Sequence, residues 1–194
     1  MIKFTQEAWN GINKLSPRSY ICGFCGDKIA SDKGYYNSSY SVISFLYICP
    51  SCGWPTFFDT QNDQYPGPML GRNIKHLPEN IEVVYNELRE DIKNGSYTSA
   101  VLLGRKLIMH LAVDIAKAPE GESFVKYITH LKSSGYVPPN GDKWLEYMKD
   151  MGNEKNHEIK IGSKEEAERI IKFVEMLLIF IYEFSQEFEQ AGEK

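Results

Sequence analysis

Residues 163–184 read SKEEAERIIKFVEMLLIFIYEF, and this stretch decides the fold of the larger part of the chain. Ser163 and Glu166 have the spacing of a capping box, in which each side chain hydrogen-bonds to the backbone of the other residue. The apolar residues that follow recur at helical spacing: Ala167, Ile170, Ile171, Val174, Leu177, Leu178, Ile181 and Phe184. The stretch therefore predicts a long helix that buries one face in a helical core.

The segment from Met176 to Tyr182 is apolar on all sides of this predicted helix. Such a segment has to be covered by several neighbours rather than by one. A second copy of the chain would supply that cover, so we predict a homodimer.

Further helical patterns lie between the N-terminal third and this last helix. One begins near Pro78 and stops at Asn94-Gly95, and the next runs over residues 97–118 ahead of Pro119. A third, spanning 124–131, ends at Gly135, and a shorter one surrounds residues 144–148. Together they predict an α-helical bundle over residues 77–190, joined by a linker at 66–76 that is rich in Pro, Gly and Asn.

Two Cys-x2-Cys-Gly units lie in the N-terminal part. Their cysteines are Cys22, Cys25, Cys49 and Cys52. Two residues between thiolates allow one tight turn to present both sulfurs to one ion, so this spacing predicts a tetrahedral zinc site. Four thiolates leave no open coordination position, so the zinc is expected to stabilise the fold rather than to catalyse. Two disulfides or a reactive dithiol are the alternative.

The residues around the cysteines favour strands. Segments 39–48 and 54–58 are rich in β-branched and aromatic residues, so residues 1–65 resemble a zinc ribbon. Tyr35, Tyr36 and Tyr40 would stack on nucleic-acid bases if exposed, or pack within the small sheet if buried. The expected fold is thus mostly α, with a small N-terminal β unit.

The composition, 42% hydrophobic and 25% charged residues, is that of a globular protein. Its longest apolar run falls far short of the roughly 20 residues that cross a bilayer, and the N-terminus has no signal-peptide pattern. We therefore expect a cytoplasmic protein without membrane contact. The net charge of −4 argues against a uniformly basic nucleic-acid coat, although residues 1–76 carry more basic than acidic side chains.

Several short motifs of the helical part occur in the order found in a known family. They are NGSYTSA at 94–100, LGR at 103–105, the segment 124–131, GYV at 135–137, GN at 152–153, and His157. Over residues 78–185 this pattern resembles the domain of unknown function DUF4145, which belongs to the HEPN group of helical domains. The resemblance implies a HEPN-like α-helical bundle and a setting in prokaryotic or phage-related defence.

Active HEPN ribonucleases combine an Arg, a following polar residue and a His in metal-independent RNA cleavage. By this resemblance Asn153 takes the polar position and His157 the His position, where it would move protons. The Arg position is Gly152. Loss of a transition-state donor typically costs about 10²- to 10³-fold in rate. Arg105 is the candidate substitute cation.

Each of these residues also has a structural interpretation. Asn153 would cap the turn after Gly152, His157 would hydrogen-bond within the bundle, and Arg105 would pair with an acid. We therefore expect a zinc-containing module that binds nucleic acid, RNA or DNA, or a partner such as a defence-system protein. The alternatives are a metal-independent endoribonuclease that uses His157, and a protein-protein adaptor.

Overall fold

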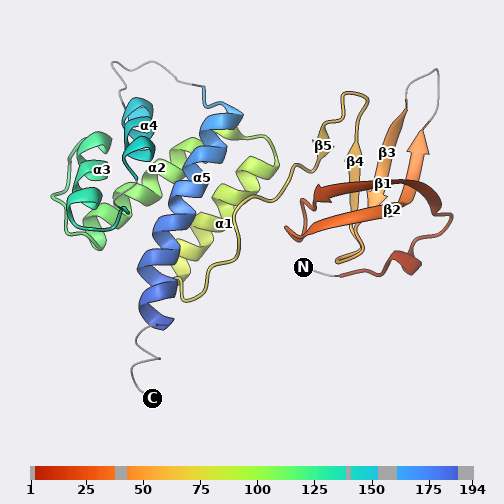
Figure 1. Ribbon diagram of the computed structural model, residues 1–194, viewed down its shortest axis with the longest axis horizontal. Helices are drawn as coiled ribbons and strands as arrows, with labels where there is room; N and C mark the ends of the chain where they lie inside the picture. The colour runs from red at the N-terminus through yellow and green to blue at the C-terminus, as the bar shows by residue number, and fades with distance from the viewer. Residues whose placement is uncertain (1–2, 38–42, 139–140, 153–160, 188–194) are drawn as a thin grey trace. The chain divides into compact units, whose positions relative to one another are not determined.

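The computed structural model describes residues 3–37, 43–138, 141–152 and 161–187 (Figure 1). The chain divides into two compact units. The first comprises Met1–Leu70 with Lys93–Gly95, and the second comprises Gly71–Ile92 with Ser96–Lys194. Within the described ranges, no helix is both long and apolar enough to span a membrane.

The first unit is an antiparallel five-stranded sheet in which each strand pairs with its neighbours in sequence. A short 3-10 helix η1 (Gln6–Ala8) precedes β1 (Asn13–Ile21), β2 (Lys28–Asn37), β3 (Ser44–Ile48), β4 (Pro55–Phe58) and β5 (Gln64–Tyr65). The predicted strands at 39–48 and 54–58 correspond to β3 and β4, although residues 39–42 lie outside the described residues. The strands β1, β2 and β5 are additional to those predicted.

One face of this sheet forms the core of the first unit. Leu15, Tyr20, Tyr47 and Phe58 are buried there beside the cysteines. Aromatic edges meet in this core, with the rings of Tyr20 and Phe58 5.3 Å apart at an angle of 76°. Aromatic packing on this face therefore stabilises the sheet.

The second unit is helical. It contains α1 (Glu79–Lys93), α2 (Tyr97–Asp114), α3 (Phe124–Ser133), α4 (Asp142–Gly152) and α5 (Lys164–Leu178), followed by the π-helix η3 (Ile179–Phe184). α2 packs against α3 and α5, and α4 packs against α3 and α5 (Figure 1). The helical content of the second unit and the small β-sheet of the first confirm the predicted fold class at this level.

The start of α5 is the predicted capping box. Ser163 Oγ accepts from the backbone N–H of Glu166, and the Glu166 carboxylate accepts from the backbone N–H of Ser163. These bonds satisfy donors that the first turn of a helix otherwise leaves unpaired. The prediction from the sequence is confirmed here.

The other end of the last helix differs from the prediction of one continuous α-helix. From Ile179 the backbone widens into the π-helix, and Glu183 is buried with only 6% of its surface exposed. The Arg72 guanidinium binds both carboxylate oxygens of Glu183, at 2.8 and 3.1 Å, and the backbone N–H of Lys75 adds a third bond. An acidic side chain is rarely buried unless it is paired, and this one has three donors.

The apolar segment 176–182 is covered only in part within the described residues. Leu177 and Leu178 are buried, whereas Phe180 is 48% exposed and Phe184, just beyond the segment, is 45% exposed. Coverage of this segment by a second copy of the chain stays a prediction.

Candidate functional site

The four cysteines lie on two loops with the same backbone hydrogen bonds. In the first loop, Gly26 N–H donates to the carbonyl of Cys22, and Cys22 N–H donates to the carbonyl of Asp27. The second loop repeats both bonds, from Gly53 to Cys49 and from Cys49 to Trp54. The repetition places two equivalent turns opposite each other, between β1 and β2 and between β3 and β4.

Each turn ends in a glycine with left-handed backbone geometry. The φ angles are 75° at Gly26 and 73° at Gly53, values that favour residues without a Cβ. At Gly53 an added Cβ would also lie 2.3 Å from the carbonyl oxygen of Phe4. Glycine is thus required by backbone conformation in both turns, and by close packing in the second.

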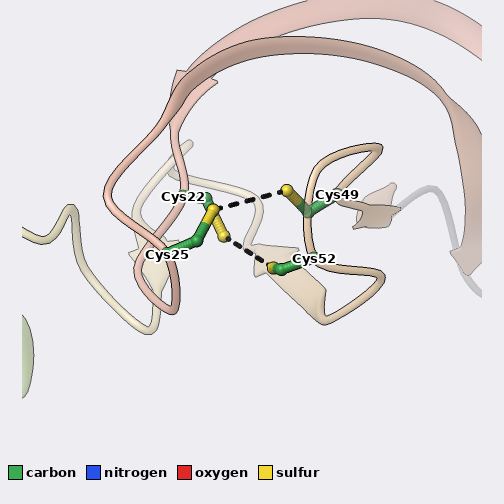
Figure 2. Close-up of side chains that lie close together, drawn as sticks. All are labelled: Cys22, Cys25, Cys49 and Cys52. Atoms are coloured by element: carbon green, nitrogen blue, oxygen red, sulfur yellow. Dashed lines mark hydrogen bonds between the residues drawn. The ribbon is translucent and has the colours of Figure 1, made fainter. Parts of the chain in front are cut away.

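The sulfurs of all four cysteines lie within 4.8 Å of one another (Figure 2). The Sγ atoms of Cys22 and Cys52 are 3.7 Å apart, and those of Cys25 and Cys49 are 3.8 Å apart. A tetrahedral ion with metal–sulfur bonds of about 2.3 Å has sulfur–sulfur edges of about 3.8 Å. A disulfide would need about 2.05 Å, and all four cysteines are free thiols. The arrangement has the dimensions of a metal site, and the structure contains no disulfide among these four cysteines.

Backbone N–H groups point at the sulfurs. Phe24 N–H donates to Cys22 Sγ at 3.4 Å. Burial raises the pKa of Cys52 to about 12, since the backbone N–H of Trp54 offsets only part of that effect. At Cys49 burial also acts to raise the pKa, but hydrogen bonds from the backbone N–H groups of Cys52 and Ser51 and from the Cys52 and Cys22 side chains together lower it. Hydrogen bonding within the loops therefore favours the thiolate only at Cys49, and a bound cation would be needed to hold the full set as thiolates.

Aromatic side chains enclose the cluster. Trp54 stacks on Phe24 with ring centroids 4.8 Å apart, and Phe4 meets Trp54 edge-on at 5.2 Å. The backbone N–H of Phe4 donates to the carbonyl of Cys52, so the N-terminal segment is tied to the second turn. Four sulfurs at tetrahedral spacing, N–H donors and a water-excluding surround fit a structural metal ion held by Cys22, Cys25, Cys49 and Cys52.

The sheet face opposite the core carries a row of apolar side chains across four strands. Directly paired residues of neighbouring strands share a face, and the register pairs Tyr35 with Leu46, Leu46 with Phe57, and Phe57 with Tyr65. We call these four residues the aromatic row. Its β4–β5 end is open to solvent, with Phe57 39% and Tyr65 53% exposed.

The β2 end of the aromatic row is covered. The Tyr35 ring lies 6.4 Å from that of Trp9, and its hydroxyl donates to the carbonyl of Asn10. Tyr36, 56% exposed, pairs with Phe45 and so belongs to the opposite face, and Tyr40 lies outside the described residues. The sequence therefore pointed to tyrosines of β2, whereas the exposed row ends at Phe57 and Tyr65. The sequence feature that could have identified this end of the row is the pair Phe57-Phe58. Successive side chains of a strand point to opposite faces of the sheet, so one of these two rings has to face away from the core.

The helical unit is where the chain can be compared with known proteins. Residues 86–194 match the family model described as Domain of unknown function (DUF4145). This match covers more than half of the chain. The chain belongs to the DUF4145 family. Comparisons with curated proteins and with solved structures give no match.

Of the three candidate catalytic residues in the DUF4145 segment, the structure describes only Arg105. Asn153 and His157 lie outside the described residues. α4 ends at Gly152, immediately before these residues. The guanidinium of Arg105 lies over the ring of Phe124, 4.9 Å from its centroid. This cation–π contact gives Arg105 a structural role in joining α2 to the start of α3.

Proposed function

We propose that this protein is a zinc-containing, nucleic-acid-binding module in which the β unit binds single strands and the DUF4145 unit is a HEPN-like helical bundle. The observation that carries the proposal is the solvent-exposed end of the aromatic row. Exposed, adjacent rings on a small sheet are the usual platform for unpaired bases.

The geometry of Phe57 and Tyr65 supports stacking. Their ring centroids are 6.4 Å apart and their planes are inclined by 38°, so both rings can be approached from the same side of the sheet. Each base–aromatic stack contributes about 1–3 kcal/mol to binding and needs no particular base. The expected ligand is therefore a single strand bound with little sequence preference.

Positive charge lies on the same face at the other side of the sheet. Lys33 is two residues from Tyr35 in β2 and therefore shares its face, and its partner in β1 is Lys14; both side chains are exposed. Near the open end, Asp59 Oδ1 accepts the backbone N–H groups of Gln61 and Asp63, which offsets part of its charge. The two lysines supply the contacts to phosphates, and binding should weaken as salt increases.

Zinc is the ion that best suits the four-cysteine site. A closed set of four thiolates is the common structural zinc site, and the alternative for such a set is an iron–sulfur centre or another thiophilic metal. Metal analysis of the purified protein by mass spectrometry should give one zinc per chain. Iron in place of zinc would contradict this assignment.

The HEPN-like resemblance extends the proposal to the whole chain. Gly152 in place of the phosphate-binding Arg favours recognition over cleavage, because glycine offers no guanidinium. A homodimer through the partly exposed segment 176–182 and a setting in prokaryotic or phage-related defence belong to the same proposal and rest on the family resemblance and on the exposed Phe180.

The test is fluorescence anisotropy with labelled single-stranded RNA and DNA at several salt concentrations. Phe57→Ala and Tyr65→Ala should each weaken binding about 5- to 150-fold, the equivalent of one lost stack. Tyr36→Ala is the matched control, because this exposed tyrosine lies on the opposite face and its loss should leave binding unchanged.

Two results would overturn the proposal. Equal losses for Tyr36→Ala and Phe57→Ala would mean that the aromatic row is not the binding surface, and a complete absence of binding would favour a protein-protein adaptor. RNA cleavage in EDTA that is abolished by His157→Ala would establish the endoribonuclease alternative instead.

A further inference from the structure

A cavity of about 580 Å³ lies in the helical unit, separate from the residues of the proposed nucleic-acid surface. Its volume falls in the range of small-molecule sites, roughly 300–1,000 Å³. The apolar lining consists of Tyr136, Val137, Met176, Ile179, Phe180 and Phe184. Met176, Ile179 and Phe180 also belong to the segment 176–182 of the proposed homodimer, whereas Tyr136, Val137 and Phe184 have no role in the function proposed above.

One wall of the cavity is the turn that follows α3. The backbone N–H of Tyr136 donates to the carbonyl of Leu131, and that of Gly135 donates to the carbonyl of Lys132. This pair of bonds is a Schellman motif, and Gly135 has the positive φ of 82° that it requires. Tyr136 and Val137 are thus held in place by the helix end.

The opposite wall is the end of α5 and the π-helix η3. A π-helix has a wider turn than an α-helix, and such segments are frequent at functional sites. Here Glu183 is held by Arg72 on one side of the helix, while Phe180 and Phe184 line the cavity. The Phe180 ring meets Tyr136 edge-on at 6.5 Å, which joins the two walls. Both walls are fixed by hydrogen bonds, so the cavity is preformed.

Two charged residues, Lys172 and Glu175, complete the lining. Glu175 Oε1 accepts the backbone N–H of Arg72 at 3.0 Å, so its carboxylate is already engaged. Lys172 is exposed and forms no ion pair within the part of the chain that the structure describes. Glu175 keeps its negative charge, so the positive group available to a ligand is the ammonium group of Lys172.

We propose that this cavity binds a small molecule with an apolar body and one carboxylate. The apolar body lies between Tyr136, Met176 and Phe180, and the carboxylate pairs with Lys172. The lining residues of this cavity belong to the second compact unit, whereas the aromatic row belongs to the first.

The test is isothermal titration calorimetry of the full chain with decanoate, decanol and decyltrimethylammonium as probes of equal chain length. Decanoate should bind with a one-to-one stoichiometry and a Kd on the order of tens of micromolar, the affinity expected for a ligand of this size. Lys172→Gln should weaken decanoate binding about three- to fivefold without affecting decanol, because an exposed ion pair contributes modestly. Lys164→Gln, an exposed lysine of the same helix outside the cavity, should change neither.

Met176→Trp tests the location, because the larger side chain fills the cavity and should abolish binding while the circular dichroism of the helices is retained. If this variant does not fold, Phe180→Ser and Phe184→Ser at exposed positions should each weaken binding. Equal affinity for the three probes, tighter binding of the cationic probe, or unchanged binding in the filled variant would overturn the proposal. It would also be overturned if the chain is a stable dimer that excludes decanoate, since a second copy would then occupy the cavity.

Discussion

Gly104 is the residue at which the Ile170 side chain of α5 packs directly against the backbone of α2. A Cβ at this position would lie 2.8–3.0 Å from three carbons of Ile170, which is completely buried. A glycine inside a helix costs up to about 1 kcal/mol relative to alanine, so the contact with Ile170 has to offset that loss. Gly104 thus acts through packing between helices.

Gly104→Val should therefore lower the free energy of unfolding by about 2–3 kcal/mol, since the added carbons overlap Ile170 in a filled core. Urea denaturation followed by circular dichroism measures the change. Lys106→Val places the same side chain at an exposed position of α2 and should cost less than about 1 kcal/mol, which isolates helix propensity. Equal losses would mean that propensity, not packing, explains Gly104.

The sequence identified Gly104 only as part of a family motif, because a distance to Ile170 arises from tertiary packing of residues far apart in the chain. The cysteines were different. Their spacing predicted the two tight turns, which follow from local geometry, and the preference of one ion for four thiolates predicted that the turns meet. Phe57 and Tyr65 could not be singled out, since the register of the strands decides which rings share a face.

At the scale of elements, α5 combines one end that the sequence predicted and one that it did not. Its capping box rests on local hydrogen bonds between residues three apart. Within the π-helix η3, Glu183 pairs with Arg72, which lies 111 residues away in the sequence. No local pattern indicates a π-helix at 179–184, because the stabilising contact is not local.

Ser163→Ala should destabilise the helical unit by about 1 kcal/mol, since the first turn of α5 loses a side-chain acceptor. Thermal unfolding measured at the helix band of the circular dichroism spectrum tests this. Ser185→Ala, near the other end of the same helical segment, removes only a weak 3.4 Å bond to Phe180 and should be neutral. A neutral Ser163→Ala would show that the cap is dispensable in the folded unit.

The ion pair that holds η3 predicts a pH dependence. Donation by Arg72 and by the Lys75 backbone lowers the pKa of Glu183 in the folded protein. Because the folded pKa lies below the unfolded one, about 4.3, this stabilisation is present above that pH and is lost as the pH falls through the folded pKa.

Glu183→Gln should therefore cost about 1–2 kcal/mol at pH 7, a modest value because Arg72 is half exposed, and the difference from the unchanged protein should shrink towards pH 3. Chemical denaturation at a series of pH values gives both quantities. Glu187→Gln, whose ion pair with Lys75 is a long 3.9 Å contact between exposed groups, should be nearly neutral at every pH. A pH-independent loss in Glu183→Gln would contradict the electrostatic explanation.

At the scale of the whole molecule, the chain combines two compact units of different construction. The periodicity of apolar residues predicted the helical unit well, including the end of α3 at Gly135 and the cap of α5. The sheet was harder, because β1 contains Pro17 and a register shift between Lys14 and Arg18 that breaks the alternation of buried and exposed residues. The sequence therefore did not predict the strand β1.

Removal of the metal should unfold the first unit and leave the second folded. A structural zinc site contributes about 10–16 kcal/mol of apparent free energy, more than a sheet this small gains from its core. Chelation should change the fluorescence of Trp54, which stacks on Phe24, while the helical circular dichroism persists. The Trp144→Phe variant removes the signal of the helical unit, so the remaining change can be assigned to the first unit. Loss of both signals in a single transition would contradict separate stability.

The sequential strand order has a consequence for how the protein is made. Every strand pairs with its neighbour along the chain, and all four cysteines occur by residue 52. Such short-range topology assembles quickly, and domains fold as units while synthesis proceeds from the N-terminus. The β unit can consequently bind its ion and fold while the DUF4145 segment, residues 86–194, is still being synthesised.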